Sequence, residues 1–332
     1  MATLKDIAEQ AGVSASTVSR ALNGKEYINP QKRAQILKLL EENSYVLPVK
    51  TPRSSADGVL TVGVVIPDTF NMFQRQLFSI IQRFLTSFGY NTQFFFIKRD
   101  KASQMECLQR IKSDTPNGII LLDEISSPDF CEYIALAGLP VVSTIINNDD
   151  FPTIMINDRQ AAVDAVNHLI GLGHRKINFL GGSGFSFGLE RIKGYYDALE
   201  AAGLEPDKSR CFCDAQYSTE DGMYGMREML LHGRDFTALF AASDELAMGA
   251  IRALKDAGIR VPDDVSVIGF DNIENAKYFI PRLTTIHQPI EEIGEHAVTN
   301  LRRLMGVATN VYPEIIIPHK LIIRESTSST AG

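Results

Sequence analysis

Two kinds of hydrophobic pattern alternate along most of the chain. From residue 59 onward, short continuous apolar runs are separated by stretches in which apolar side chains recur every three to four residues. The continuous runs predict buried strands, and the helical spacing predicts amphipathic helices. Strands are expected at 59–66, 91–97, 118–122, 140–146, 176–182, 238–243 and 265–270. Helices are expected at Phe73–Phe88, Ala161–Leu172, Arg191–Ala202 and Glu245–Ala257.

Strands that alternate with helices of this length predict an α/β fold of doubly wound parallel sheets. One set of strands precedes Asp158 and a second set follows it. Two successive sets indicate two subdomains with a cleft between them. Ligands of such folds bind beyond the carboxyl ends of the strands, so a ligand is expected there.

The first 47 residues show helical spacing only. Thr3 and Asp6 have the spacing of a capping box at a helix start. The apolar face of this first helix consists of Leu4, Ile7, Ala8 and Ala11. Gly12 is expected to end the helix, because a left-handed residue is needed there.

Two further helices are expected in this head. Ser14 can cap the second, with Val18 and Leu22 facing inward, and Asn29-Pro30 can start the third. The third helix, with Ile36, Leu37 and Leu40 inward, is expected to end near Asn43. Two short helices joined by a turn that contains glycine, and braced by a third, are typical of the DNA-binding helix-turn-helix.

The second helix of that motif enters the major groove, where it would present Ala15, Ser16 and Arg20. Arg20 could pair bidentately with guanine, and Ala15 could meet a thymine methyl group. Side-chain oxygens and amides beside them suit phosphate contacts, namely those of Ser14, Thr17, Ser19 and Asn23. The alternative is a three-helix bundle for protein contacts, in which Arg20 is simply solvated.

Composition agrees with a folded chain of more than one domain. The 332 residues are 45% hydrophobic and 22% charged, which excludes a disordered or collagen-like protein. A net charge of −7, taken over the whole chain, opposes nucleic-acid binding. Residues 1–58, however, hold eight of the 33 basic and six of the 40 acidic side chains, a balance of +2 that leaves −9 for the rest. Whole-chain charge therefore does not exclude DNA as a partner.

Cysteines and histidines predict no metal site or cofactor. The four cysteines, at 107, 131, 211 and 213, form no CxxC pattern and are expected to be reduced, buried thiols. The six histidines lack ligand spacing, and His174 fits a helix end. Neither a secretory signal nor a run of 18 apolar residues is present, so a cytoplasmic protein without a membrane partner is expected.

One motif suggests an enzyme. Residues Gly184–Gly188 satisfy G-x-S-x-G, the nucleophile elbow of hydrolases, and Asp271 and His287 follow in hydrolase order. The elbow serine should follow its strand directly, but Gly182 and Ser183 already leave it, and no oxyanion motif is evident. Catalytic residues are therefore not assigned, and a hydrolase is kept only as a distant alternative.

The head resembles the LacI/GalR family of bacterial transcriptional regulators. TLKDIAEQAGVSASTVSRALNG, beginning at Thr3, meets the family pattern T-x-x-D-[IV]-A-x-x-A-G-V-S-x-x-T-V-S-R-x-[LIV]-N. The resemblance implies that Ala15, Ser16 and Arg20 read bases. The predicted DNA-binding residues are Thr3, Ser14, Ala15, Ser16, Thr17, Ser19, Arg20, Asn23, Lys50 and Arg53.

The linker departs from that family. Relatives usually carry Y-x-P-N-x-x-A-R-x-L, a hinge helix whose leucine wedges into the minor groove. Here Pro52 takes the alanine position and Ser55 the leucine position. Pro52 would break the helix or delay its start, and Ser55 is too small for a wedge. Lys50 and Arg53 can still meet phosphates; the alternative is a flexible tether.

The body resembles the effector-binding core of the same family, which is similar to periplasmic sugar-binding proteins. The matching stretches include GVVIPD (63–68), GLGHRKINFLGG (171–182), SDELAMGAIRAL (243–254) and VPDDVSVIGFDN (261–272). The implied domains are a DNA-binding domain at 1–47, a linker at 48–58 and an effector-binding core at 59–332. Within the core, one subdomain takes 59–158 and 287–316, and the other takes 159–286 and 317–332.

Seven residues are expected to bind the effector, a small molecule such as a sugar. Asp271 follows a buried strand, and its carboxylate could accept hydrogen bonds from two hydroxyl groups. Arg191 could donate hydrogen bonds from its rigid, forked guanidinium. Phe185 and Phe187 could stack on a sugar face. Family positions also fall on Phe73, Asp158 and Ser243. The alternatives are that Phe73 belongs to the core, that Asp158 caps a helix and that Asp271 forms a turn.

The resemblance also implies partners. Near-palindromic operators are read by dimers, and the end of the chain has no leucine heptad, so a homodimer is expected. The function predicted is a repressor of a sugar-utilisation operon, controlled by its effector. Control by a phosphorylated carrier protein or by a non-sugar ligand is the alternative.

Overall fold

The computed structural model describes most of the chain after the linker, and it also describes parts of the head. The described residues are 4–14, 17–18, 21, 32, 35–36, 38–39, 58–68, 71–125, 127–144, 151–307 and 314–330. Their contacts divide the chain into two compact units. The first unit comprises 1–70, 78–155 and 291–315, and the second comprises 71–77, 156–290 and 316–332. The predicted domain boundaries stay predictions; the grouping of 71–77 with the second unit was not among them.

Helix α1 (Leu4–Ala11) opens the head, and the predicted inward face is confirmed for Ile7, Ala8 and Ala11; the Leu4 side chain is not among those described. Ile7, Ala8 and Ala11 are buried against Val18, Ala21 and Ile36. Gly12 has φ +63°, the left-handed conformation expected at a helix end. The Ser14 hydroxyl accepts from the Thr17 backbone N–H at 3.2 Å, and Thr17, Val18 and Ala21 are helical. A short turn therefore joins two helices that share one apolar core.

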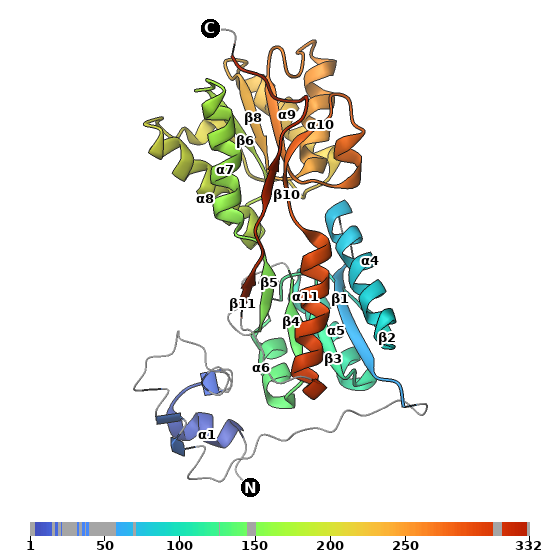
Figure 1. Ribbon diagram of the computed structural model, residues 1–332. Coiled ribbons are helices and arrows are strands. Elements are labelled where there is room, and N and C mark those ends of the chain that lie inside the picture. Colours follow the sequence, from blue (N-terminus) through green and yellow to red (C-terminus); the bar gives the residue numbers. More distant parts are fainter. Residues whose placement is uncertain are drawn as a thin grey trace. The chain divides into compact units, whose positions relative to one another are not determined.

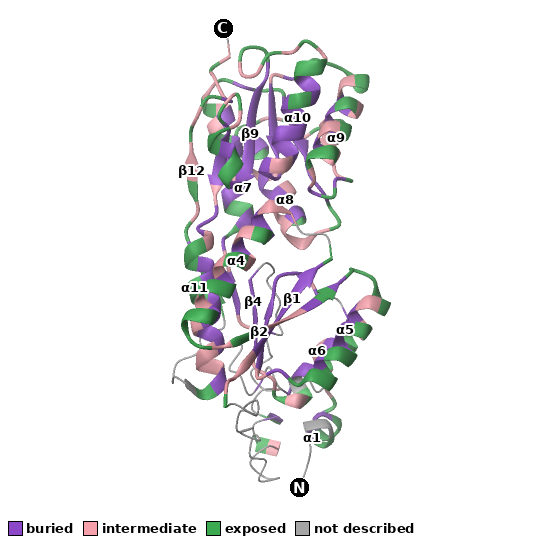
Figure 2. Ribbon diagram, turned by 90° about the vertical axis from the view of Figure 1, so that its right-hand side faces the viewer, coloured by how far each residue is buried: buried purple, intermediate pink, exposed green. Residues whose placement is uncertain are grey.

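A sheet whose strands β1 to β5 are parallel forms the centre of the first unit, with strand order β11-β5-β4-β3-β1-β2 (Figure 1). The strands are β1 (Thr61–Pro67), β2 (Asn91–Ile97), β3 (Gly118–Leu121), β4 (Val141–Ser143), β5 (Thr153–Met155) and β11 (Glu314–Ile316). Helices α4 (Met72–Ser87) and α11 (Ile290–Arg302) cover one face, and α5 (Lys101–Asp114) and α6 (Pro128–Ala137) cover the other (Figure 2). Within this unit, a Cβ at Gly294 of α11 would lie 2.5 Å from Ile80 of α4, so the two helices pack closely.

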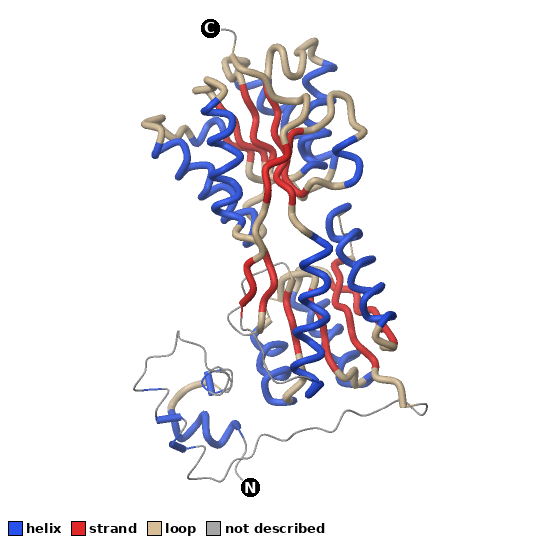
Figure 3. Tube along the Cα trace, viewed as in Figure 1, coloured by secondary structure: helices blue, strands red, loops and turns tan. Residues whose placement is uncertain are grey.

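A second sheet, with strand order β12-β10-β9-β8-β6-β7, forms the centre of the second unit. Its strands are β6 (Ile177–Leu180), β7 (Cys211–Phe212), β8 (Ala238–Ala241), β9 (Ser266–Asp271), β10 (Thr284–His287) and β12 (Lys320–Ile322). Helices α7 (Asp158–Gly171) and α8 (Ser186–Ala201) lie on one face, and α9 (Thr219–His232) and α10 (Asp244–Asp256) on the other (Figures 1 and 3). All pairings are parallel except that of β12 with β10.

Both units therefore have the predicted α/β architecture. The inner strands are buried along their whole length; β3, β6, β8 and β9 are buried at every residue. Such strands have helices on both faces, which is why they read as continuous apolar runs. Short segments complete the structure: η1 (Lys208–Arg210), η2 (Glu274–Lys277) and η3 (Arg303–Val307). Within the described ranges, none of the helices has both the length and the apolar character needed to span a membrane.

All four cysteines are free thiols, as expected. Cys107 is buried, whereas Cys131, Cys211 and Cys213 are only half-buried, so the expectation of full burial holds for Cys107 alone. His174 follows the end of α7 and is buried. Its Nε2 donates to the Ser328 carbonyl at 3.0 Å. No group of three or more His, Cys, Asp or Glu in the part of the chain that the structure describes could hold a metal ion.

Candidate functional site

Polar groups gather at the carboxyl edge of the sheet in the second unit. Strands β6, β8, β9 and β10 are parallel neighbours, so their last residues meet at one edge. Asp271 ends β9, Gln288 follows β10, and the Ala242 carbonyl follows β8. This is the edge at which α/β sheets bind ligands.

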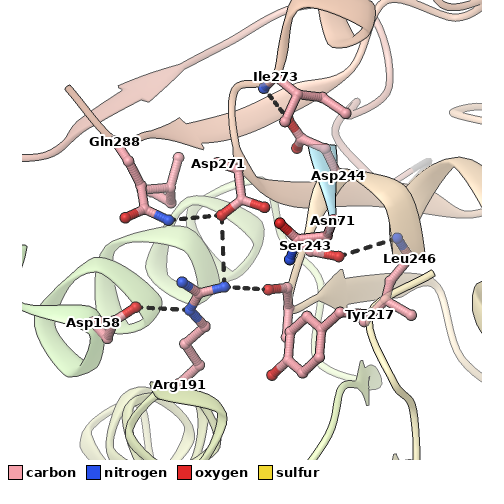
Figure 4. Close-up of polar contacts among 12 residues, drawn as sticks. Asn71, Asp158, Arg191, Tyr217, Ser243, Asp244, Leu246, Asp271, Ile273 and Gln288 are labelled. Atoms are coloured by element: carbon pink, nitrogen blue, oxygen red, sulfur yellow. Dashed lines mark hydrogen bonds and ion pairs between the residues drawn. The ribbon is translucent and has the colours of Figure 1, made fainter. Parts of the chain in front are cut away.

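Arg191 lies at the centre of this cluster (Figure 4). Its Nε donates to Asp158 Oδ1 at 2.8 Å, and its Nη1 donates to the Ala242 carbonyl at 2.6 Å. The same Nη1 lies 3.7 Å from Asp271 Oδ1. The guanidinium also lies over the Phe270 ring, 3.7 Å from its centroid. Arg191 is only 4% exposed, so these contacts replace most of its hydration.

Asp271 combines a strained backbone with a buried carboxyl group. Its φ is +108° and that of Asn272 is +57°, so the chain turns sharply where β9 ends. The Gln288 side-chain amide donates to Asp271 Oδ1 at 2.7 Å. Burial raises the pKa of Asp271 to about 7, although Arg191 and the Gln288 hydrogen bond oppose the shift. The turn-forming role expected from the sequence is confirmed, and the binding role stays a prediction.

Asp158 is the first residue of α7, and its carboxylate pairs with Arg191. The helix cap is the preceding residue, Asn157, whose side chain accepts from the Gln160 N–H at 2.9 Å. The alternative that Asp158 caps the helix is therefore wrong. Burial raises the pKa of Asp158, and Arg191 opposes the rise.

Ser243 and Asp244 begin α10. The Ser243 hydroxyl accepts from the Leu246 N–H at 3.2 Å and so acts as the helix cap. Asp244 is fully buried; its carboxylate accepts from the Thr285 hydroxyl at 2.6 Å and from the Ile273 N–H at 2.8 Å. Burial raises the pKa of Asp244 well above its usual range, and the negative charge of Asp271 adds to the rise. Asp244 thus holds the strained turn in place.

Three aromatic rings adjoin the cluster. Phe185 and Phe187 lie 5.1 Å apart, and each contacts Tyr217, at 4.9 Å and 5.1 Å between centroids. Phe187 also lies 5.0 Å from the Arg191 guanidinium. The two predicted phenylalanines are half-buried, and Tyr217 is buried with φ +66°. Tyr217 was not predicted, because it sits in a loop without a spacing signal.

The first turn of α4 belongs to the same unit. Phe73 is buried there, and Figure 4 includes Asn71, which precedes the helix. The Glu245 carboxylate, on α10, accepts from the Met72 N–H at 2.8 Å. The structure thus brings Asp158, Arg191 and Asp271 into direct contact, places Phe187 against Arg191, and buries Phe73 and Ser243 in adjoining helix starts. The binding roles of these residues stay predictions.

The hydrolase alternative finds no support in this geometry. Strand β6 ends at Leu180, and Ser186 is the first residue of α8, so the serine is not on a strand-to-helix elbow. His287 Nδ1 lies 3.1 Å from the Asn272 side-chain nitrogen.

Of the predicted DNA-binding residues, the structure describes two. The Ser14 and Thr17 hydroxyls lie 2.8 Å apart at the start of the second helix. The predictions for Thr3, Ala15, Ser16, Ser19, Arg20, Asn23, Lys50 and Arg53 lie outside the described residues.

Comparison with known proteins supports both parts of this architecture. Residues 3–47 match the family described as bacterial regulatory proteins, lacI family, and residues 166–327 match the periplasmic binding protein-like domain. Catabolite control protein A of Priestia megaterium is 30% identical over 98% of this chain and 99% of its own length.

Solved structures show the same similarity over nearly the full length. A transcriptional regulator CelR–cellobiose complex has a TM-score of 0.73 and 27% identity, covering 98% of this chain and 100% of its own. The lac repressor dimer bound to operator and the anti-inducer ONPF has a TM-score of 0.73 and 25% identity, covering 98% and 99%.

A head of this kind on a two-unit α/β core defines a DNA-binding transcriptional regulator rather than an enzyme. The chain belongs to the LacI family of bacterial regulatory proteins.

Proposed function

We propose that this regulator is a repressor of a sugar-utilisation operon, whose affinity for its operator changes when a sugar binds in the second unit. The observation that carries the proposal is the buried group formed by Arg191, Asp158 and Asp271 at the carboxyl edge of the sheet. A relative of known structure is a complex with cellobiose, which supports a sugar as the ligand. Ligand binding would shift the population of conformations that bind DNA.

The proposed ligand contacts follow from the chemistry of the side chains. Asp271 and Asp158 would accept hydroxyl groups, and Arg191 would hold both carboxylates in position. Phe185 and Phe187 would cover an apolar sugar face. Phe73 and Ser243 would border the ligand from the starts of α4 and α10.

Replacement of Asp271 tests the ligand site. In the Asp271→Ala variant, we expect the sugar to lose its effect on operator binding, measured by fluorescence anisotropy of labelled operator DNA. Asp263→Ala is the matched control, because Asp263 is exposed and pairs with Arg260 on the surface. A response that survives in Asp271→Ala would remove this residue from the ligand site.

The head is proposed to read a near-palindromic operator as part of a homodimer. Arg20, Ala15 and Ser16 would contact bases, while Thr3, Ser14, Thr17, Ser19, Asn23, Lys50 and Arg53 would position the head on the backbone. Arg20→Ala should weaken operator binding by about tenfold or more. Lys38→Ala, on the third helix, is the control. If both variants weaken operator binding equally, the proposed role of Arg20 is rejected.

Regulation by a phosphorylated carrier protein is the alternative that the sequence left open. Such a partner would bind the protein surface, so Asp271→Ala would leave its effect intact. Titration of the dimer with sugars and with the phosphocarrier protein separates the two. We place the regulator in the cytoplasm, where its DNA lies.

A further inference from the structure

We propose that the ligand of the second unit is a hydroxylated molecule without net negative charge, that is, a neutral sugar and not a sugar phosphate or a sugar acid. This inference rests on the proposed function, because it names the charge class of the ligand at the same site. It follows from how the charges of the described residues are already compensated.

The guanidinium of Arg191 is the group that an anionic ligand would seek, yet its charge is already balanced. Asp158 accepts from Nε at 2.8 Å, and Asp271 Oδ1 lies 3.7 Å from Nη1. Phe270 and Phe187 lie over the guanidinium, with centroids at 3.7 Å and 5.0 Å. A phosphate or carboxylate could reach this cation only by displacing a buried carboxylate, which would then be left unpaired.

Carboxylates outnumber cations around the site. Asp158, Asp271, Asp244 and Glu245 lie within this group of helix starts and strand ends. Besides Arg191, the positive charges that act on them are Arg324, near Asp244, and Arg75, near Glu245. With all seven groups ionised the balance is negative; with Asp244 protonated, as its raised pKa favours, three carboxylates still match the three cations. These groups therefore leave no excess of positive charge to attract an anion.

Helix N-termini often bind anions, and those of α7 and α10 are occupied by side chains of the protein itself. In α7, Asn157 caps the first turn and Asp158 supplies an acidic side chain there. In α10, Ser243 caps the first turn, which also contains Asp244 and Glu245. The first turn of α8 has no side-chain cap, and its Gly188 packs against backbone, since a Cβ there would lie 2.0 Å from the Gly182 carbonyl oxygen.

The groups near Arg191 include several acceptors. Asp271 and Asp158 have carboxylate oxygens, and Gln288 adds a side-chain carbonyl. Hydroxyl groups donate to such acceptors without adding charge. The site therefore suits a polyhydroxylated neutral molecule.

Matched pairs of probes test this inference on the full-length dimer. The pairs are D-ribose and D-ribose 5-phosphate, D-glucose and D-glucose 6-phosphate, D-glucose and D-glucuronate, and cellobiose and cellobionate. Affinities are measured by isothermal titration calorimetry, after a thermal-shift screen. We expect at least one neutral probe to bind, with its anionic partner at least about tenfold weaker, because like charges at close range oppose binding.

Each outcome decides between the two proposals. Suppose that an anionic probe binds as tightly as its neutral partner, or binds when the neutral partner does not, and that this binding is lost in Asp271→Ala. That result overturns the charge inference but supports the proposed ligand site. If no probe of either class gives binding that depends on Asp271, both the charge inference and the sugar-effector proposal are rejected.

A substitution at Asp158 tests whether the compensated charge of Arg191 is what excludes anionic ligands. Asp158→Asn keeps the shape of the side chain and removes one of the charges that compensate Arg191. The affinity ratio of the anionic to the neutral probe should then rise by about tenfold. Asp164→Asn, on the same helix and 45% exposed, is the matched control and should leave the ratio unchanged. An equal ratio in both variants would overturn the compensation argument, and the wild-type comparison decides the inference even if Asp158→Asn fails to fold.

Discussion

At the scale of single residues, the burial of Arg191 is the feature on which the site depends. A guanidinium that has lost its hydration needs charge and hydrogen-bond partners, and Asp158, Asp271 and the Ala242 carbonyl supply them. The dependence is mutual, because both carboxyl groups are also buried. Removal of the cation therefore leaves two buried acids without their partner.

Arg191→Met should lower the free energy of unfolding by about 3–5 kcal/mol, because a broken buried ion pair leaves an uncompensated charge. Arg159→Met provides the comparison. Arg159 donates to Asp197 at 2.8 Å, but both side chains are more than a third exposed, so its loss should cost about 1 kcal/mol or less. Urea unfolding of both variants measures the difference; similar losses would contradict the argument.

The stability of the protein should depend on the ionisation of Asp271. Burial raises its folded-state pKa to about 7, above the usual value of 3.8, so the folded state holds a proton that the unfolded chain has released. The contribution of the protonated Asp271 to the free energy of unfolding is fully present below pH 4 and is lost as the pH rises through 7. Between pH 5 and pH 8, wild type should lose on the order of 2 kcal/mol relative to Asp271→Asn.

The comparison with Asp271→Asn is essential, because burial lowers the pKa of His168 and of His174. Those histidines act in the opposite direction, since their contribution to stability is lost as the pH falls through 6.5. Chemical unfolding at several pH values gives the free energy of unfolding of wild type and of Asp271→Asn. The difference between the two isolates the contribution of Asp271. A difference that stays constant from pH 5 to pH 8 would contradict a raised pKa.

Single residues also show what the sequence can and cannot reveal. Asp271 and Arg191 were predicted because one ends an apolar run and the other begins a helical pattern. Gln288 could have been found by the same logic, since it follows the next strand of the sheet. Asp244 and Tyr217 could not, because their roles come from burial and from contacts with Thr285, Gly182 and the aromatic rings, which are distant in the sequence.

At the scale of elements, α9 and α10 are packed backbone to backbone. A Cβ at Gly249 of α10 would lie 2.0 Å from the Thr219 carbonyl oxygen of α9. In the other direction, a Cβ at Gly222 would lie 2.3 Å from the Leu246 carbonyl oxygen. These two glycines allow a separation that no larger residue fits. The contact holds the first turn of α10, and thus Ser243 and Asp244, in place.

Gly249→Ala should therefore lower the free energy of unfolding by about 1–3 kcal/mol, since an extra methyl group must push two helices apart. Gly171→Ala is the matched control, because no atom lies within 4 Å of a Cβ at Gly171 of α7. That change should be neutral or stabilising by up to about 1 kcal/mol. Thermal unfolding compares them, and a destabilisation of equal size in both would refute the packing explanation.

Hydrophobic spacing predicted which helices and strands exist, but it did not always predict the residues at which they begin and end. Helix α8 begins at Ser186, five residues before the predicted Arg191. Its cap is Phe185, which makes no side-chain cap hydrogen bond, so the usual signal of a helix start is missing. Strand β4 (Val141–Ser143) lies inside the apolar run at 140–146, of which 145 and 146 lie outside the described residues.

At the scale of the whole molecule, charge is unevenly divided. The balance of +2 over residues 1–58 and −9 over the rest places the DNA-binding charge in a small part of the chain. A dimer would make twice as many phosphate contacts as a single head. Salt dependence of operator binding therefore reports on the proposed contacts of Lys50 and Arg53.

Arg53→Ala should make the plot of log affinity against log salt less steep by about 2, because a dimer would lose one phosphate contact from each linker. Lys208→Ala, an exposed change in the second unit, should leave the slope unchanged. Operator titrations from about 50 to 200 mM salt measure the slopes. An unchanged slope in Arg53→Ala would show that the linker is only a tether.

The second unit is assembled from three separate stretches of chain, 71–77, 156–290 and 316–332. The shortest of them is the start of α4, a single helix whose remaining residues belong to the first unit. A sensor built in this way cannot be excised from the gene or exchanged with that of another regulator as one contiguous cassette. Fusion proteins that give this sensor a different DNA-binding head must keep the chain intact from β1 through residue 332, with the junction in the linker before Gly58.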